Sequence, residues 1–201
     1  LSRYHMIEPG DSVLAAVSGG PDSVALIRLL HCIAPRWKIS LAVAHVNHGL
    51  RPDAAQAADF VAELSQRLGL PCHHLTRDVG AFGRHHGMSI ETAGRAVRYG
   101  FFSDLCIRHG YRRVAVGHHR DDCAEQMLMN LARGSGPSGL TGIAPTRDDW
   151  VIRPLIAFSR QDILAYLSAA GQTYVVDATN ADRRMTRNRI RHEILPVLAE
   201  Q

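Results

Sequence analysis

The sequence predicts an α/β fold in which a doubly wound parallel sheet carries helices on both faces, a three-layer sandwich. Short apolar runs, often β-branched, alternate with longer segments of helical spacing along most of the 201 residues. Glycines follow several of the helical segments, where they favour a helix end. The composition, 46% hydrophobic and 21% charged, is typical of a globular domain and excludes collagen-like and disordered chains.

The first half of the chain contains three predicted strands and three predicted helices. Residues 13–17 form a continuous apolar run, as expected for a strand that is buried on both faces. The helical pattern at 90–109 is followed by Gly110, a residue that readily adopts the left-handed conformation that ends helices. We predict strands at 13–17, 39–46 and 71–75, and helices at 23–34, 54–68 and 90–109.

The second half continues the same alternation. Its predicted elements are a strand at 114–117, a helix at 121–133, a glycine-rich loop at 134–142, a strand at 151–155 and a helix at 159–170. Ser159 is expected to cap the start of that last helix. We expect one domain at residues 1–175, followed at 176–201 by an arginine-rich segment and the start of a linker helix.

The charged residues and the cysteines restrict the class of function. The net charge is +4, and Lys38 is the single lysine among the 23 basic residues. This balance permits a polyanionic partner. Cys32, Cys72, Cys106 and Cys123 form no C-x-x-C pair and lie in apolar segments, so we expect buried free thiols. No apolar run is long enough to span a bilayer, and no signal-peptide pattern occurs, so we expect a cytoplasmic location.

A candidate phosphate-binding loop lies between the first strand and the first helix. Residues 18–23 read Ser-Gly-Gly-Pro-Asp-Ser. The glycines let the backbone approach an anion, and the helix start and the hydroxyls of Ser18 and Ser23 supply donors. Asp22 would repel phosphate unless a divalent cation lay between them, which implies Mg²⁺. A plain strand-to-helix turn capped by Ser23 is the simpler alternative, but two hydroxyls and an acid at these offsets favour phosphate.

Two known nucleotide-binding motifs are excluded for this loop. A Walker loop would end in Gly-Lys-Ser or Gly-Lys-Thr, which is absent, and the dinucleotide motif G-x-G-x-x-G does not follow the first strand.

A second group of polar residues follows the fourth predicted strand. His118, Asp122 and Glu125 have the spacing i, i+4 and i+7, which would place them on one face of a helix. In a parallel sheet this face would lie at the same edge as the phosphate loop. There a carboxylate could hold Mg²⁺, orient an amine or accept its proton. The simpler alternative is a solvated acidic first turn. A zinc site is disfavoured because no thiolate lies at a fixed offset, and the pair His85–His86 is expected in a polar loop.

Residues 18–23 resemble the S-G-G-x-D-S signature of the N-type ATP pyrophosphatase (PP-loop) family, which splits ATP into AMP and pyrophosphate. Further stretches resemble, in the same order, the members of that family that modify the anticodon of isoleucine tRNA. They are 45–51, Glu91 with Arg95, Arg98 and Tyr99, 117–122 with Glu125, 133–134, 153–155 and 187–191. Because they run in order over nearly the whole chain, they are more specific together than alone. The resemblance implies a Rossmann-like fold of the adenine nucleotide alpha hydrolase type.

The resemblance also implies a two-step ligase reaction. ATP would adenylate the 2-carbonyl oxygen of the first anticodon cytidine of tRNA(Ile) with a CAU anticodon. The ε-amine of free L-lysine would then displace AMP to give lysidine, which changes codon recognition from AUG to AUA. The cofactors implied are ATP and Mg²⁺, with Mg²⁺ on Asp22. Members of the family often carry further C-terminal domains that bind tRNA, and residues 176–201 are expected to start a linker helix toward such a region.

The resemblance assigns roles to particular residues. Asp122 is the expected proton acceptor and Glu125 holds the amine, with His118 and Asp22 as the other catalytic residues. The residues expected to bind the nucleotide are Ser18, Gly19, Gly20, Pro21, Asp22, Ser23, His45, Asn47, Arg95 and Arg187. Asn188 and Arg191, with Arg187, are expected to close over the adenylate or the RNA backbone.

Two alternative functions remain open. A PP-loop tRNA thiolase would adenylate the same kind of carbonyl but deliver sulfur, for which Cys123, next to Asp122, is the candidate thiol. A nucleotide-binding module without catalysis would hold ATP without turning it over. Both alternatives share the phosphate loop and differ in the chemistry beside it.

Overall fold

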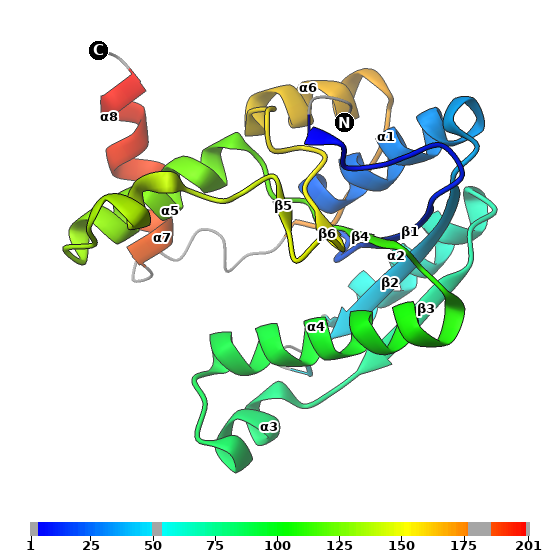
Figure 1. The fold of residues 1–201 in the computed structure, drawn as a ribbon, viewed down its shortest axis with the longest axis horizontal. Coiled ribbons are helices and arrows are strands. Elements are labelled where there is room, and N and C mark those ends of the chain that lie inside the picture. Colours follow the sequence, from blue (N-terminus) through cyan, green and yellow to red (C-terminus); the bar gives the residue numbers. More distant parts are fainter. Residues whose placement is uncertain (1–3, 50–53, 177–185, 200–201) are drawn as a thin grey trace.

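The fold is known from a computed structural model that describes residues 4–49, 54–176 and 186–199 (Figure 1). One six-stranded sheet has the order β3-β2-β1-β4-β6-β5. The strands are β1 (Ser12–Ala16), β2 (Ser40–Asn47), β3 (Cys72–Thr76), β4 (Arg113–Ala115), β5 (Thr146–Arg147) and β6 (Val151–Ile152). All neighbouring pairs are parallel except β5 with β6. The predicted parallel sheet is therefore confirmed, with one antiparallel edge strand that was not predicted.

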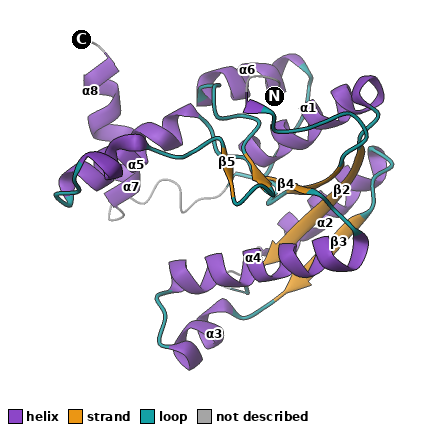
Figure 2. Ribbon diagram, in the orientation of Figure 1, coloured by secondary structure: helices purple, strands orange, loops and turns teal. Residues whose placement is uncertain are grey.

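Helices cover both faces of this sheet. They are α1 (Pro21–Trp37), α2 (Ala54–Arg67), α3 (Val79–His86), α4 (Ile90–His109), α5 (Arg120–Ala132), α6 (Arg160–Ala169), α7 (Thr186–Arg189) and α8 (Leu195–Ala199). A 3₁₀ helix, η2, lies at Pro137–Thr141, and a short π-helical stretch, η4, at Ile190–Ile194 joins α7 to α8. Figure 2 shows α1 and α6 on one side of the strands and α4 on the other.

The hydrophobic core is divided between the two faces. Val13 and Ala15 of β1 pack with buried residues of α1, α2 and α6. Leu14, between them, points to the opposite face and packs with Phe102 and Leu105 of α4. Successive side chains of a strand alternate between faces, so one apolar strand serves both layers. The expected doubly wound three-layer α/β fold is confirmed.

Local signals placed several helix ends correctly. Helix α4 has the predicted bounds: Ser89 caps its start by accepting the Thr92 N–H, and Gly110 ends it with φ of +71°. Ser159 caps α6 and forms a reciprocal capping box with Asp162. Helix α3 was not predicted, because its eight residues are too short for a clear period, so the expected polar loop at His85–His86 is wrong.

Three further expectations need correction. The predicted strand at 151–155 contains only the two residues of β6, and Arg153 and Pro154 lie beyond it. Strand β5 pairs with it through a turn in which Asp148 and Asp149 have positive φ, a less recognisable turn sequence than Asn-Gly. The cysteines are free, but Cys32 and Cys72 are exposed and the other two are partly buried, because their apolar segments expose one side.

Two features of the overall arrangement bear on function. Helix α5 projects from the carboxyl end of β4, and α7 and η4 pack against it, with α8 continuing beyond η4 (Figure 1). Over the described residues, no helix combines the length and the apolar character needed to cross a membrane.

Candidate active site

The loop between β1 and α1 has a backbone shaped to receive an anion. Gly19 has φ of +93°, and its carbonyl accepts the Val175 N–H at 2.9 Å, which holds the loop in place. Ser23 Oγ donates to the Gly20 carbonyl and accepts the Ser18 N–H at 3.1 Å. Around Gly20 the nearest atom to an added Cβ would be Ser18 Oγ at 3.7 Å, so the loop is open above it. Together with the N–H groups at the start of α1, which no side chain of the N-cap residue Gly20 can satisfy, this geometry fits phosphate oxygens.

Asp22, at the start of α1, faces a cation from α6. Arg160 donates from one terminal nitrogen to both carboxylate oxygens of Asp22, at 2.9 and 3.0 Å. The Asp22 side chain keeps 28% of its surface exposed. One carboxylate beside a phosphate loop fits the usual way proteins hold Mg²⁺, in which substrate phosphates and water complete the ligand shell. The magnesium role of Asp22 stays a prediction, and the ion would share this carboxylate with Arg160.

The turn between β4 and α5 lies directly against the phosphate loop. A Cβ added to Gly117 would lie 3.2 Å from the Asp22 carbonyl carbon, so only glycine allows this approach. Helix α5 begins at Arg120 with His119 as its N-cap, and Asp122 Oδ2 accepts the His119 N–H at 3.0 Å. His118 therefore belongs to the turn and not to the helix face on which the sequence spacing placed it.

His119 lies between the phosphate loop and the start of α5. It is 1% exposed, and its Nε2 lies 3.7 Å from Asp22 Oδ1 and 3.5 Å from Asp122 Oδ2. The sequence interpretation selected its neighbour His118 instead. The signal that could have identified His119 is its position directly before a helix whose first turn is acidic, because a side chain at that position points back toward the ends of the strands.

The two acids of α5 are buried and hold two arginines from the C-terminal segment. Asp122 is 8% exposed and Glu125 is 0% exposed. Arg187 donates through Nε to Glu125 at 2.6 Å and through a terminal nitrogen to Asp122 at 2.7 Å. Arg191 donates through Nε to the other oxygen of Glu125 at 2.6 Å. The alternative of a solvated acidic first turn is therefore wrong, because both acids are buried and bind guanidinium groups of the chain itself.

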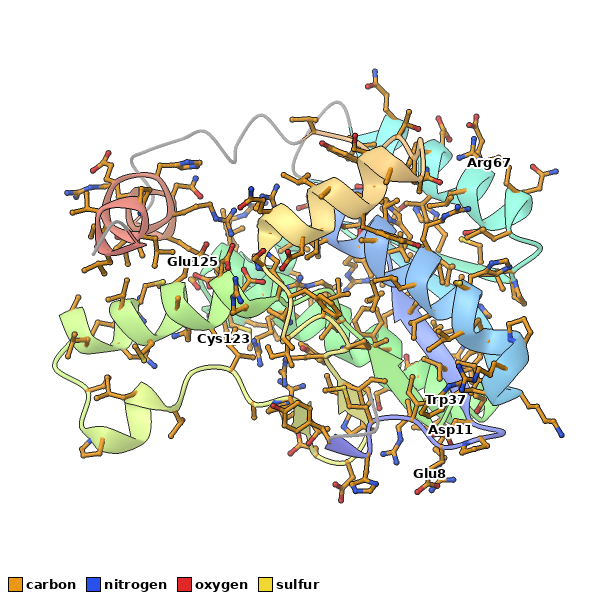
Figure 3. All side chains as sticks on the ribbon, turned by 90° about the horizontal axis from the view of Figure 1, so that it is seen from above. Glu8, Asp11, Trp37, Arg67, Cys123 and Glu125 are labelled. Atoms are coloured by element: carbon orange, nitrogen blue, oxygen red, sulfur yellow. The ribbon has the colours of Figure 1, made fainter. Side chains whose placement is uncertain are left out.

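Figure 3 shows Glu125 on the side of α5 that faces the C-terminal helices, with Cys123 on the opposite side. The Cys123 thiol contacts the Ile143 carbonyl oxygen at 3.7 Å. Burial is the main cause that raises the pKa of this thiol, and the Asp122 carboxylate adds to it. A thiol with a raised pKa is a poor nucleophile near neutral pH. In the part of the chain that the structure describes, no group of three or more His, Cys, Asp or Glu side chains could hold a metal ion.

His118 is partly buried beside the acid pair. Burial lowers its pKa to about 4, and the positive charges of Arg153, Arg187 and Arg98 act in the same direction, against the carboxylate of Asp122. The imidazole is therefore neutral at pH 7. Its Nδ1 is buried and makes no hydrogen bond to any described residue.

The other predicted nucleotide-binding residues lie on different elements. His45 Nδ1 is 2.8 Å from the Val17 carbonyl oxygen at the end of β1, and burial lowers the pKa of this imidazole. Asn47 accepts the Gly49 N–H at 2.9 Å after β2. The Arg95 guanidinium lies on α4, 5.1 Å from the centre of the Tyr99 ring. The nucleotide roles of these residues and of Arg187 stay predictions, as does the boundary at residues 175/176. Arg51 and residues 177–185 lie outside the described residues.

Comparison with known proteins places this site in a family. The family model described as "PP-loop domain" matches residues 3–198. A protein named tRNA(Ile)-lysidine synthase from Symbiobacterium thermophilum is 48% identical over 99% of this chain and 42% of its own length. A protein of the same name from Chlorobaculum tepidum is 42% identical over the whole chain and 61% of its own length.

Solved structures support the fold alone. A U34-tRNA thiolase from Methanococcus maripaludis, with its [4Fe-4S] cluster, has a TM-score of 0.69 at 16% identity, covering 98% of this chain and 74% of its own. An NH3-dependent NAD synthetase from Campylobacter jejuni has a TM-score of 0.53 at 14% identity, covering 100% of this chain and 80% of its own. The chain spans about half the length of the curated relatives it matches, from 42% to 61% in these two. With the family match covering residues 3–198 and the loop geometry described above, the chain belongs to the PP-loop domain family.

Proposed function

We propose that this chain is an ATP-dependent ligase that joins L-lysine to the first anticodon cytidine of tRNA(Ile). ATP adenylates the 2-carbonyl oxygen of the base and releases pyrophosphate, and lysine then displaces AMP to give lysidine. Relatives named tRNA(Ile)-lysidine synthase support this reaction at 42–48% identity. A tRNA-modifying role also supports the expected cytoplasmic location. Residues 1–175 would form the catalytic domain, and residues 176–201 the link toward a tRNA-binding region.

The first step depends on the phosphate loop. The N–H groups at the start of α1, with the Ser18 and Ser23 hydroxyls, would hold the phosphates of ATP. Asp22 would hold Mg²⁺, and the bound ion would supply positive charge to the phosphates. The attacking base oxygen then forms a bond to the α-phosphorus as the bond to pyrophosphate breaks.

The second step depends on the acid pair, and one observation carries the proposal: a buried pair of carboxylates that binds cations lies one histidine away from the phosphate loop. Asp122 and Glu125 hold guanidinium groups at 2.6–2.7 Å, and His119 lies within 3.7 Å of both Asp22 and Asp122. An ammonium group has the same charge and the same donors as these nitrogens. The substrate amine would displace Arg187 from Asp122 and transfer a proton to this carboxylate. Its nitrogen then bonds to the activated ring carbon, and AMP leaves with the C–O electron pair.

The direct test is mass spectrometry of an anticodon stem-loop RNA with a CAU anticodon after incubation with the chain, ATP, Mg²⁺ and lysine. We expect a lysine adduct on the first anticodon cytidine. Reactions without ATP or without lysine, and an RNA with uridine in place of that cytidine, should give no adduct. Absence of the adduct, when the same RNA and ATP both bind, would contradict the proposal.

The same reaction separates the two alternatives. A thiolase would require a persulfide on Cys123, and the raised pKa of this thiol argues against that role. A persulfide-specific label on Cys123 together with sulfur in the RNA would favour the thiolase. Tight ATP binding without release of pyrophosphate in the presence of RNA and lysine would favour the module without catalysis.

A further inference from the structure

Four arginines gather beside the acid pair, on the side of the sheet covered by α4. This arginine cluster consists of Arg95 and Arg98 on α4, Arg147 on β5 and Arg153 after β6. Arg95 and Arg147 both contact the Tyr99 ring, with guanidinium carbons 5.1 and 4.2 Å from its centre. The ring itself packs edge-on against Trp150 at 6.2 Å. Elements far apart in the sequence thus bring four positive charges together.

The arginine cluster has few acidic partners. Of the four arginines in the cluster, only Arg147 has a described carboxylate within ion-pair distance. This is Asp148, at 3.2 Å, and the Asp148 side chain is 70% exposed. Arg98 donates from Nε to the Gly94 carbonyl of its own helix. Arg153 is 5% exposed and donates to the Ala144 carbonyl, while its Nε is buried and makes no hydrogen bond within the described part of the chain. Neutral carbonyls do not balance the charge of these guanidinium groups.

Burial and the positive charges of the neighbouring arginines both act on the pKa values of Arg153 and Arg98. Burial lowers the pKa of Arg153, and the charges of Arg147 and Arg95 lower it further. Burial is also the main cause that lowers the pKa of Arg98; Arg95 acts in the same direction, whereas Tyr99 and the Glu91 carboxylate act against it. Like charges held this close repel each other, and a bound anion would recover that free energy.

The position of the cluster identifies the anion. The phosphate loop opens at the start of α1, which packs on one face of the sheet, whereas Tyr99 belongs to the core of the opposite face. The first half of α4 lies near His48 at the end of β2, so this part of the helix is at the carboxyl edge, close to the active site. Under the proposed function the loop holds the triphosphate, which leaves the arginine cluster free to bind a second anion.

We propose that the arginine cluster binds phosphodiester groups of the RNA next to the reacting base. Guanidinium groups match phosphate oxygens in charge and in the geometry of paired N–H donors, and arginines with an aromatic neighbour are typical of RNA-binding surfaces. The RNA backbone therefore crosses α4 and β5, while the base points toward His118 and Asp122. This inference rests on the proposed function, because it takes RNA as the substrate.

The salt dependence of RNA binding tests this site. Fluorescence anisotropy would give the dissociation constant of a labelled CAU stem-loop RNA between about 50 and 200 mM KCl. We expect Arg95→Gln and Arg147→Gln each to reduce the slope of log K against log salt by about 1, and to weaken binding roughly three- to tenfold. Arg147→Lys should keep most of the slope. For Arg147→Gln, ATP binding and the thermal midpoint should stay close to wild type.

The matched control is Arg108→Gln, which removes the same charge from an exposed position in the last turn of the same helix. Helix α4 ends there beside the amino end of β1, where Ser12 Oγ donates to the Gly110 carbonyl, on the side of the sheet away from the site. The control should leave the slope unchanged.

Different outcomes distinguish this inference from the proposed function. Equal slopes for the wild type and the two cluster variants would overturn the RNA site, even if the lysine adduct forms. A raised KM for lysine with unchanged RNA slopes would assign the cluster to the carboxylate of the amino acid and would also overturn it. Arginine-dependent slopes without any adduct would support the site and contradict the proposed reaction. No binding of the RNA by the wild type would overturn both.

Discussion

The phosphate loop and the acid pair are neighbours that are built in opposite ways. Within the loop the bonds are local, such as those of the Ser23 hydroxyl within residues 18–23, and one backbone bond from Val175 to Gly19 ties the loop to a distant segment. The acid pair is held by long side chains from a distant segment: Glu125 and its partner Arg187 are 62 residues apart. The loop is therefore preorganised for its ligand. The acid pair is already occupied by Arg187 and Arg191, so under the proposed function an incoming amine would have to exchange with them.

The largest expected effect comes from Glu125→Gln, which tests whether the acid pair anchors the C-terminal segment. The change leaves the buried ends of Arg187 and Arg191 without their shared carboxylate, so we expect a loss of about 3 kcal/mol in the free energy of unfolding. Trypsin should then cleave faster at the arginines of α7 and η4. Urea denaturation and timed proteolysis measure both effects. Glu63→Gln, an exposed change on α2, should alter neither, and an unchanged cleavage rate for Glu125→Gln would contradict the anchor.

Asp122→Asn should impair lysine transfer at the acid pair and leave ATP binding at the phosphate loop intact. Asparagine can still accept the His119 N–H, so the helix start is kept, but it cannot accept a proton from the amine. We expect lysine transfer to fall about 100-fold at saturating lysine, with ATP affinity unchanged. Quenched-flow measurement of the adduct and calorimetric titration with ATP give the two quantities. Asp104→Asn, on the exposed side of α4, is the control, and full lysine transfer by Asp122→Asn would exclude its role as proton acceptor.

A pH series should affect the acid-pair region through His118. Its folded pKa of about 4 lies below the unfolded value of 6.5, so the unfolded chain binds more protons between these values. The contribution of His118 to stability is therefore complete above pH 6.5 and is lost as the pH falls toward 4. When the pH falls from 7 to 5, we expect the free energy of unfolding to fall by about 2 kcal/mol less in His118→Gln than in the wild type. Parallel urea titrations at the two pH values measure the difference, and identical losses would show that this imidazole is not the group that titrates.

Gly117→Ala should disturb the contact between the two regions. The added methyl group would lie 3.2–3.3 Å from backbone atoms of Asp22 and Ser23, which cannot move without shifting the phosphate loop. We expect a loss of about 1.5 kcal/mol in stability together with weaker ATP binding. Gly100→Ala, in an open position within α4, should instead stabilise the protein by about 0.8 kcal/mol. If Gly117→Ala bound ATP as tightly as wild type, the turn and the loop would not be coupled.

Local signals predicted much of the fold and half of the candidate site. The bounds of α4 followed from its helical pattern and from Gly110 at its end, and the phosphate loop from six consecutive residues. Prediction failed where the information is not local. Strand β5 has two residues, too few to show a period, and its turn uses Asp148 and Asp149 at positive φ. His119 was missed because only the approach of the β4–α5 turn to Asp22 gives it two carboxylate neighbours.

From its sequence alone, this protein was determined to be a doubly wound α/β domain with a phosphate loop after its first strand. The alternation of apolar runs with helical segments, the capping residues and the glycines are local signals, so they can be recognised in the sequence before the fold is known. Tertiary structure alone decided which cations occupy Asp122 and Glu125, and that four arginines share one face beside them. Such pairings join residues dozens of positions apart, and their energies depend on burial, which exists only once the layers have packed.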